Sequence, residues 1–340
     1  FILIGILIFL WVYEFFAGPQ SIEVITQNYD KLYFLILAHI LTLYFDALSW
    51  YVLVGHKKLG IAWAFLITWI SQAAGKFFPT GNITGEFVRA YLGIRRGLTT
   101  VQSSSTVFAD IVIATYALVI ISIFSFFIII SNNLNFFSIE NSFVFYASLL
   151  FFFVSCFIIF FLIRKRFIRF FLKKIPKFFK FTLKKKIVIT LLKIDFYLFR
   201  LSKEKNKVLK ALVLRLIGWL SGAFEIYVFL WIIGIEANYL DLVILESFTS
   251  LIKAFAFFIP GGLGVQELAF VMIGEFIGLS GPISFSIAIG RRIREILVGV
   301  PAVAFWMILF NRKSQMMNQS SLKNAVLSLS GGMDSSTLLL

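Results

Sequence analysis

The stretch Phe257–Glu267, FFIPGGLGVQE, decides how the rest of the chain folds. Pro260 lacks the backbone donor that a helix needs, and the glycines after it open backbone angles that other residues avoid. The flanking sequence is apolar enough to span a bilayer, where irregular backbone is tolerated only if protein packs around it or if it lines a wet cavity. A tight turn carrying a surface Glu is the simpler interpretation. We expect a broken helical hairpin that holds Glu267 inside the protein.

Composition indicates the class of protein. Sixty per cent of the residues are hydrophobic and 14% are charged, against about 25% charged in a soluble domain. Apolar runs long enough to cross about 30 Å of hydrocarbon recur along the chain, so we predict an all-α polytopic membrane protein. The expected spans are 1–17, 31–54, 61–78, 103–130, 142–163, 211–234, 240–258 and 283–310, with shorter helices at 83–96 and 263–279.

The broken hairpin occurs twice. Residues 76–99, KFFPTGNITGEFVRAYLGIRRGLT, align without a gap with residues 257–280, FFIPGGLGVQELAFVMIGEFIGLS, at an offset of 181. Both copies contain the pattern P-x-G-x4-E-x6-G-x3-G-L, and four of its six shared positions are Pro or Gly residues that interrupt helices. The predicted breaks are Pro79, Gly81, Pro260, Gly261, Gly262 and Gly264.

Basic residues predict the orientation. Segment 164–210 holds seventeen Lys and Arg against two acidic residues, a surplus of fifteen that equals the formal charge of the whole chain, +15. Interleaved with Phe, Leu and Ile, this segment is expected to lie as an amphipathic cytoplasmic element on anionic lipid headgroups rather than to bind nucleic acid. The positive-inside rule then places the connections near 18–30, 131–141, 235–241 and 279–282 outside. The two hairpins therefore face opposite sides, as an inverted-topology repeat, which is typical of transporters with a site near the midplane.

Charged residues inside the spans are the candidate site, because they are costly in hydrocarbon without partners. Glu86 and Arg89 share a helix face, and Asp110 begins a long apolar span near the headgroups. In GRRIREILVG (290–299), Arg291, Arg294 and Glu295 share one side of a helix. Three interpretations of this cluster stay open: a site for an anionic headgroup, an internal ion-pair network with Glu267, Glu246 or Asp110, or a rim of snorkelling side chains. The predicted substrate-binding set is Glu86, Arg89, Asp110, Glu267, Arg291, Arg294 and Glu295.

Other chemistries lack the residues they need. His39 and Asp46 share a face of one span and Glu225 stands alone in another. The chain has two His and one Cys, Cys156, without a metal-ligand spacing. We predict no metal, no cofactor and no catalytic constellation.

Three stretches, FFPTGNITGEFVRA (77–90), FFIPGGLGVQE (257–267) and RRIREILVGVP (291–301), resemble the flippase-like, lysylphosphatidylglycerol-synthase transmembrane superfamily. The resemblance covers about 1–312 and is nearest to the hopanoid-associated membrane proteins. It implies a multi-pass protein of the bacterial cytoplasmic membrane that moves or presents lipids. Synthases of this superfamily carry a soluble catalytic domain after their spans, and no such domain is visible here.

The sequence changes from apolar to polar near residue 313. A polar linker at 313–323 leads into an apolar stretch, expected to be a strand, that ends in SGGMDSS. Segment 324–340 resembles the start of a PP-loop ATP pyrophosphatase of the 7-cyano-7-deazaguanine synthase type. The matching nucleotide-binding residues are Ser330, Gly331, Gly332, Asp334 and Ser335. A nucleotide-binding fold needs on the order of 100 residues or more, so this site is incomplete in the chain.

Three functions follow from these observations. The favoured one is a lipid transporter that handles an isoprenoid or anionic lipid, more a carrier than an enzyme. The second is the membrane component of a lipid-modifying system for aminoacyl lipids or hopanoids. The third is a membrane anchor for a PP-loop enzyme, with a cytoplasmic C-terminus.

Overall fold

The structure is a computed structural model that describes residues 2–55, 59–78, 82–131, 185–256 and 259–330, with isolated positions between 154 and 172. Within these ranges every regular element is a helix, which confirms the predicted all-α class. Of the described helices, four runs are long and apolar enough to cross a membrane: Leu3–Gln27, Tyr29–Val54, Thr100–Ser131 and Lys205–Ile232. Only isolated positions of the predicted span 142–163 are among the described residues. The predicted breaks Pro79 and Gly81 lie outside them.

The N-terminal part differs from the prediction of a loop at 18–30. Helix α1 (Ile2–Val12) runs through a π-helical turn (Tyr13–Ala17) into α2 (Gly18–Gln27). Gly18, at φ 59°, redirects the chain. Pro19 follows in the first turn of α2, where its fixed φ suits a helix start. A short 3-10 turn (Tyr29–Lys31) then leads into α3, Tyr33–Val54.

Both broken hairpins are present. The first consists of α4 (Ile61–Phe77) and α5 (Asn82–Arg95), followed by the long helix α6 (Thr100–Ser131). The second consists of α11 (Tyr239–Phe255), the 3-10 turn η3 (Pro260–Gly262) and α12 (Val265–Phe276), followed by α13 (Gly281–Ser330). Because α6 and α13 begin 181 residues apart, the sequence offset is also the offset of the helices.

The turns after the two hairpins have the same geometry. The Leu98 N–H donates to the Gly93 carbonyl oxygen at 3.1 Å, and the Leu279 N–H donates to the Gly274 carbonyl oxygen at 2.9 Å. The glycine between them has a positive φ in each copy, 98° at Gly97 and 89° at Gly278. The identical positions of the sequence repeat therefore build one local structure twice.

A close approach repeats as well. A Cβ on Gly93 would come within 2.5 Å of Ser103 Oγ, and one on Gly274 within 2.1 Å of Ser284 Oγ. Ser103 and Ser284 are also 181 residues apart. Each hairpin is thus pressed against the helix that follows it at a point where only glycine fits.

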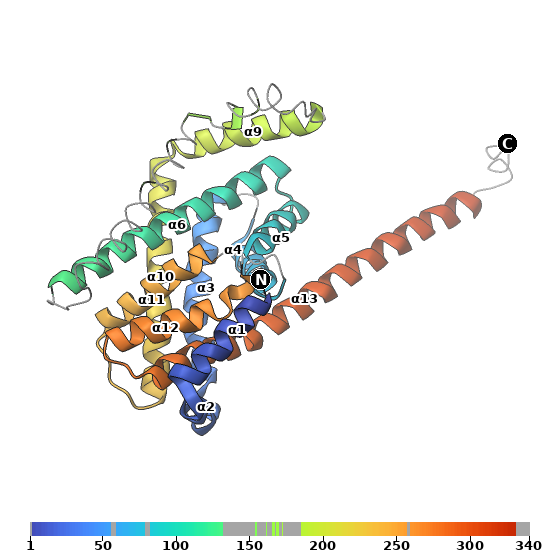
Figure 1. Cartoon of the computed structure of the whole chain (residues 1–340). Coiled ribbons are helices and arrows are strands. Elements are labelled where there is room, and N and C mark those ends of the chain that lie inside the picture. The colour runs from blue at the N-terminus through green and yellow to red at the C-terminus, as the bar shows by residue number, and fades with distance from the viewer. Residues whose placement is uncertain are drawn as a thin grey trace.

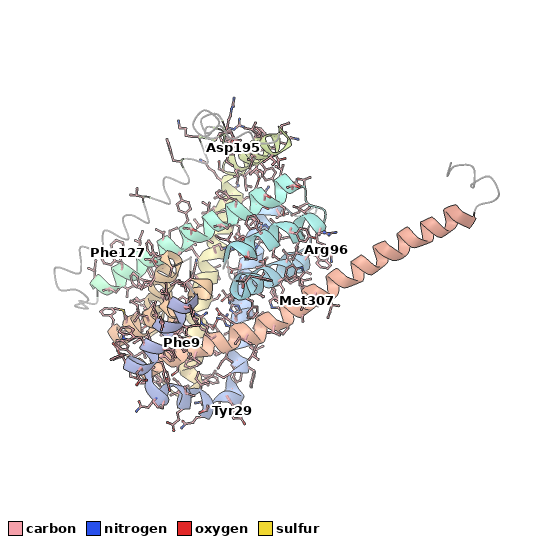
Figure 2. The ribbon with its side chains drawn as sticks, turned by 45° about the vertical axis from the view of Figure 1, so that its right-hand side comes forward. Phe9, Tyr29, Arg96, Phe127, Asp195 and Met307 are labelled. Carbon is pink, nitrogen blue, oxygen red and sulfur yellow. The ribbon has the colours of Figure 1, made fainter. Side chains whose placement is uncertain are left out.

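The hairpins pack around α3 and α10 (Lys205–Ile232), which contact each other more extensively than any other two helices. Helix α10 begins six residues before the predicted span at 211, inside the basic segment. The main apolar core is formed by α10 with α6, α11 and the start of α13, around the buried residues Leu118, Ile226, Phe229, Leu242, Val243, Phe248 and Phe270. Helix α9 (Lys185–Leu201) lies across the upper end of α10 (Figure 1). Asp195 in α9 and Tyr29 lie at opposite ends of the molecule (Figure 2).

The C-terminal segment corrects another expectation. Helix α13 continues through the predicted linker at 313–323 and through the apolar stretch that was expected to form a strand, as far as Ser330. Its last part extends away from the rest of the chain (Figure 1). The residues from 313 on contain no Pro or Gly before Gly331 that would stop a helix. Gly331, Gly332, Asp334 and Ser335 lie outside the described residues.

Candidate functional site: two buried charge networks

The first network is centred on Asp110 of α6, which is completely buried. Arg89 of α5 donates to Asp110 Oδ2 at 2.7 Å, and Ser49 of α3 donates to Oδ1 at 2.8 Å. Arg215 of α10 pairs with both carboxylate oxygens, donating from Nε to Oδ1 at 3.2 Å. Asp110 therefore does not lie near the headgroups, as the sequence suggested. Two arginines and a hydroxyl hold its charge inside the protein, which is how a buried carboxylate becomes tolerable.

Further carboxylates complete this cluster, which we call the Asp110 network. Asp46 of α3 accepts from Arg215 Nη1 at 2.5 Å and from Gln72 of α4 at 2.9 Å. Glu86 lies 3.4 Å from Arg89 Nη1, on the helix face that the two residues were expected to share. Three carboxylates face two arginines, giving a formal charge of −1. Asp110 and Arg215 lie ten residues after the starts of α6 and α10, about 15 Å along each helix, toward the α9 end of the bundle.

The second cluster, the Glu225 network, is centred on Glu225 of α10, whose side chain is 2% exposed. Arg294 of α13 donates to Glu225 Oε1 from Nε at 3.0 Å and from Nη2 at 2.6 Å. His39 of α3 lies between them, with Nδ1 3.2 Å from Glu225 and Nε2 3.4 Å from Arg294. This geometry fits a neutral imidazole that donates from Nδ1 and accepts at Nε2. Arg291 pairs with Glu246 of α11 at 2.6 Å.

A third group lies beside it, where the last turn of α4 meets η3, and we call it the tip cluster. Glu267 is completely buried at the start of α12. It accepts from the Gly264 N–H at 2.7 Å, closing the helix N-terminus as a cap, and from Arg292 Nε at 2.8 Å. Glu295 accepts from Lys76 of α4, 3.1 Å away. The hydrogen bond to the Gly264 N–H and the ion pair with Arg292 thus offset the free-energy cost of burying the Glu267 charge at membrane depth.

The second break adjoins the end of α4. The last turn of α4 contacts η3, and a Cβ on Gly261 would lie 3.8 Å from the carbonyl oxygen of Lys76. Arg292 Nη1 donates to the Gly261 carbonyl oxygen at 2.8 Å, which fixes the second tip to α13. The Gly261 carbonyl oxygen, which lies in the break between two helices, therefore accepts a hydrogen bond from a side chain. Backbone polar groups inside a bilayer need such a partner within the protein.

The structure brings the predicted residues together in two groups rather than one. Glu86, Arg89 and Asp110 belong to the Asp110 network, whereas Glu267, Arg291, Arg294 and Glu295 belong to the Glu225 network and the tip cluster. The expected internal ion pairs of the arginine cluster with Glu246 and Glu267 are present. Asp110 pairs instead with Arg89 and Arg215.

Several residues of these networks were missed by sequence reasoning. Arg215 has a visible signal, since it is an isolated Arg inside an apolar run. Arg292 was not among the predicted residues, since it lies about a quarter turn from Arg291 on the helix, yet it contacts Glu267. Lys253 carries the same kind of signal, a charge inside the expected span 240–258, and was not among the predicted residues. Gln72 carried no signal that a single sequence shows, because its partner Asp46 comes from another helix.

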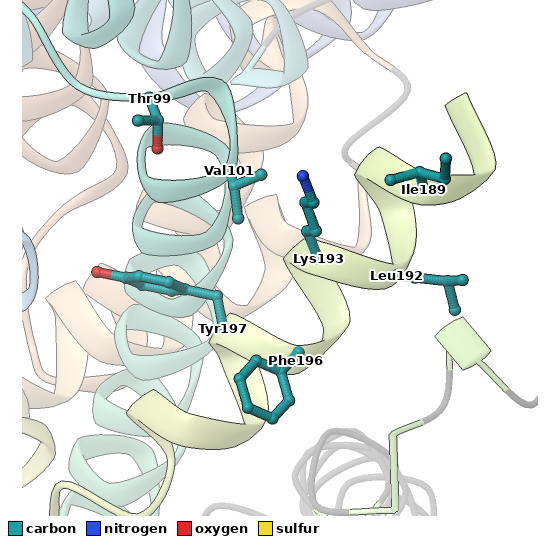
Figure 3. A pocket seen from close by; sticks show the side chains of 7 residues that line it. All are labelled: Thr99, Val101, Ile189, Leu192, Lys193, Phe196 and Tyr197. Atoms are coloured by element: carbon teal, nitrogen blue, oxygen red, sulfur yellow. The ribbon is translucent and has the colours of Figure 1, made fainter. Parts of the chain in front are cut away.

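A separate pocket lies outside these networks. It is formed by α9 and the start of α6 (Figure 3), and has a volume of about 600 Å³. Its lining is mostly apolar, and Lys193 supplies the charge. Partial burial raises the pKa of Tyr197 above its ordinary value. The lining residues are Thr99, Val101, Ile189, Leu192, Lys193, Phe196 and Tyr197.

The fold and these networks define a multi-pass helical membrane protein with a charged interior. Residues 2–302 match the family described as the lysylphosphatidylglycerol synthase TM region, and the chain belongs to this family. The chain matches no curated protein and no solved structure. Among the described residues, no group of three or more His, Cys, Asp and Glu is arranged to hold a metal ion.

Proposed function

We propose that this protein moves a lipid between the leaflets of the bacterial cytoplasmic membrane by alternating exposure of a site between the two hairpins. The observation that carries the proposal is the contact of the two broken hairpins at the level of Lys76 and Gly261. Transporters built from inverted repeats bind their substrates where broken helices meet. A structural anchor would have no need of so many charges inside the membrane.

The charge networks would act as two gates. The Asp110 network lies toward the α9 end of the bundle, and the Glu225 network lies toward the other end, near the starts of α3, α11 and α13. The first joins α5 and α6 to α10 through Arg89–Asp110–Arg215, and the second joins α13 to α10 through Arg294–Glu225, with His39 of α3 beside Glu225. Opening one side would break one set of pairs while the other set stays closed. Packed interfaces with two discrete arrangements favour such switching over gradual deformation.

The orientation is part of the proposal. Helix α9 exposes Ile187, Ile189 and Phe196 beside basic residues such as Lys193 and Arg200. A helix with exposed apolar and basic residues lies in the interface and is attracted to anionic headgroups. We place this helix, the basic segment 164–210 and the C-terminus on the cytoplasmic side.

A lipid-movement assay tests this function. The purified chain is reconstituted into vesicles with fluorescent lipids, and the outer-leaflet fluorescence is quenched with dithionite. We expect accelerated loss of inner-leaflet signal with the wild type and with Glu236→Gln, which changes an exposed connection. Arg294→Gln should slow it about tenfold or more, because it leaves the buried Glu225 without its main partner. No acceleration by the wild-type chain with any native lipid would refute the proposal.

A second candidate is the membrane component of a lipid-modifying system, and the family description favours it because it names a synthase. In that case the hairpin site would present a lipid to a partner enzyme. Mass spectrometry of total lipids from cells with and without the gene distinguishes the two. Loss of a covalently modified lipid supports the second candidate, whereas redistribution of an unaltered lipid between leaflets supports transport.

A further inference from the structure

The tip cluster contains more positive than negative charge. Its cations are Lys76, Lys253 and Arg292, and its carboxylates are Glu267 and Glu295. Glu267 and Glu295 together contact Arg292 and Lys76, which leaves one cation in surplus. Uncompensated charge at membrane depth is costly. The junction is therefore suited to an additional anion.

Lys253 is the cation in surplus. Its Nζ donates to the side-chain oxygen of Gln266 at 2.5 Å, and among the described residues no carboxylate oxygen lies within ion-pair distance of it. Electrostatic interaction still links Lys253 to Glu295 and to Lys76. An ammonium group has three donors, so a second ligand can approach it beside the amide.

The backbone of the second tip is shaped around this side chain. A Cβ on Gly262 would lie 3.0 Å from Lys253 Cγ and 3.1 Å from its Cε. Gly262 also has a φ of 64°, which other residues rarely adopt. Glycine at this position therefore lets the aliphatic part of Lys253 lie along the turn, with its ammonium group at the junction.

A donor group of Arg292 is also available. Arg292 Nη2 is buried and has no hydrogen-bond partner within the part of the chain that the structure describes. The other nitrogens of the same guanidinium contact Glu267, Glu295 and the Gly261 carbonyl oxygen. A buried donor without a partner is costly, and an anion bound beside Lys253 and Lys76 would satisfy it.

The surroundings favour a lipid over a soluble anion. The Lys76 side chain is 24% exposed, and large apolar side chains beside the two lysines are exposed by a third or more: Phe77, Phe78, Ile252 and Phe255. A lipid brings acyl chains for these surfaces together with a phosphate for the cations. One phosphodiester charge balances the surplus, whereas a zwitterionic headgroup adds a new cation.

On the basis of the proposed function, we infer that the tip cluster, at the junction of α4 and η3, binds the phosphate of an anionic phospholipid headgroup through Lys76, Lys253 and Arg292. The substrate class is then a lipid whose headgroup carries net negative charge. The carboxylates Glu267 and Glu295 position the cations around it. Binding a phosphate would explain why Lys253 lies inside an apolar span.

The test measures binding separately from transport. The detergent-purified full chain is titrated with phosphatidylglycerol, phosphatidylcholine or inorganic phosphate, and bound lipid is counted by native mass spectrometry. The titration is repeated at high salt, because a Debye length of about 3 Å at 1 M screens adsorption to the exposed basic residues of α9 but not a buried pair. The variants are Lys253→Gln, Lys253→Arg, the double variant Lys76→Gln/Lys253→Gln, and Lys31→Gln as a control at an exposed position.

We expect salt-resistant binding of phosphatidylglycerol that is at least about tenfold tighter than that of phosphatidylcholine. Loss of a hydrogen bond to a charged group commonly weakens binding by this factor. Lys253→Gln and the double variant should lose the preference, while Lys253→Arg and Lys31→Gln keep it. Equal affinity for both lipids, an unaffected double variant, or competition by inorganic phosphate alone would overturn the inference. Lipid movement by a wild type without the preference would leave the proposed function standing.

Discussion

Asp110 and Arg291 occupy equivalent positions of the repeat, each ten residues after the start of its helix, and they carry opposite charges. The partners are reversed accordingly. Asp110 is held by Arg89 and Arg215, whereas Arg291 is held by Glu246 and lies 3.7 Å from Glu225. The two halves thus share a backbone plan, and each places an ion pair at the same step of its long helix with the signs exchanged.

Removing the charge of Asp110 should destabilise the protein strongly. Asp110→Asn leaves Arg89 and Arg215 buried without their shared carboxylate, and breaking a buried pair costs about 3–5 kcal/mol. Thermal unfolding of the purified chain, followed by circular dichroism, measures the loss. Asp30→Asn at an exposed position is the control. Equal melting of both variants would contradict the role of the Asp110 network.

Thr99 and Ser280 should face opposite sides of the membrane. They are exposed, 181 residues apart and equivalent in the repeat. In a Cys156→Ser background, Ser280→Cys should react with a membrane-impermeant maleimide added to intact cells, and Thr99→Cys should react only after permeabilisation. Labelling of both from the same side would exclude an inverted repeat.

The glycine contact at the second hairpin should be intolerant of a methyl group. Gly274→Ala places a Cβ 2.8 Å from Ser284 Cβ, besides the closer clash with its hydroxyl oxygen. Overpacking of this kind costs about 1–3 kcal/mol. Because the clash is local, Gly274→Ala/Ser284→Gly should recover most of the lost thermal stability. A double variant no more stable than Gly274→Ala would show that the contact is not the cause.

Gly262→Ala should affect both the backbone and Lys253. A residue other than glycine in the left-handed region costs about 1–2 kcal/mol, and the added Cβ meets the Lys253 side chain at 3.0 Å. We expect a lower unfolding temperature in detergent. Gly262→Ala combined with Lys253→Ala should recover only the part of the stability that is lost through the contact with Lys253. An unchanged melting temperature in Gly262→Ala alone would argue against the observed turn.

The class of fold could be predicted from the sequence because hydrophobic length and helix-breaking residues are local signals. The hairpins, the long helices after them and the offset of 181 appear in the structure as expected. The connection expected at 18–30 is largely helical instead, because Gly18 and Pro19 redirect one helix into the next. The linker at 313–323 was likewise helical, because polarity alone does not end a helix.

The candidate site was predictable only in part. Charges inside apolar runs identified Glu86, Glu267 and the arginines of α13. Glu246 and Glu267 were named as partners of these arginines, whereas the pairs of Glu225 with Arg294 and of Arg215 with Asp110 were not, because no single-sequence pattern connects positions that far apart. The separation of the charges into an Asp110 network and a Glu225 network was therefore not visible beforehand.

The sequence by itself determined that the chain is a helical membrane protein with two related broken hairpins, because helix length and Pro and Gly positions act within one turn of backbone. Only the tertiary structure decided which charge meets which. A buried ion pair depends on the distance between side chains of different helices, and that distance is set by how the contact of α3 with α10 brings the two halves together.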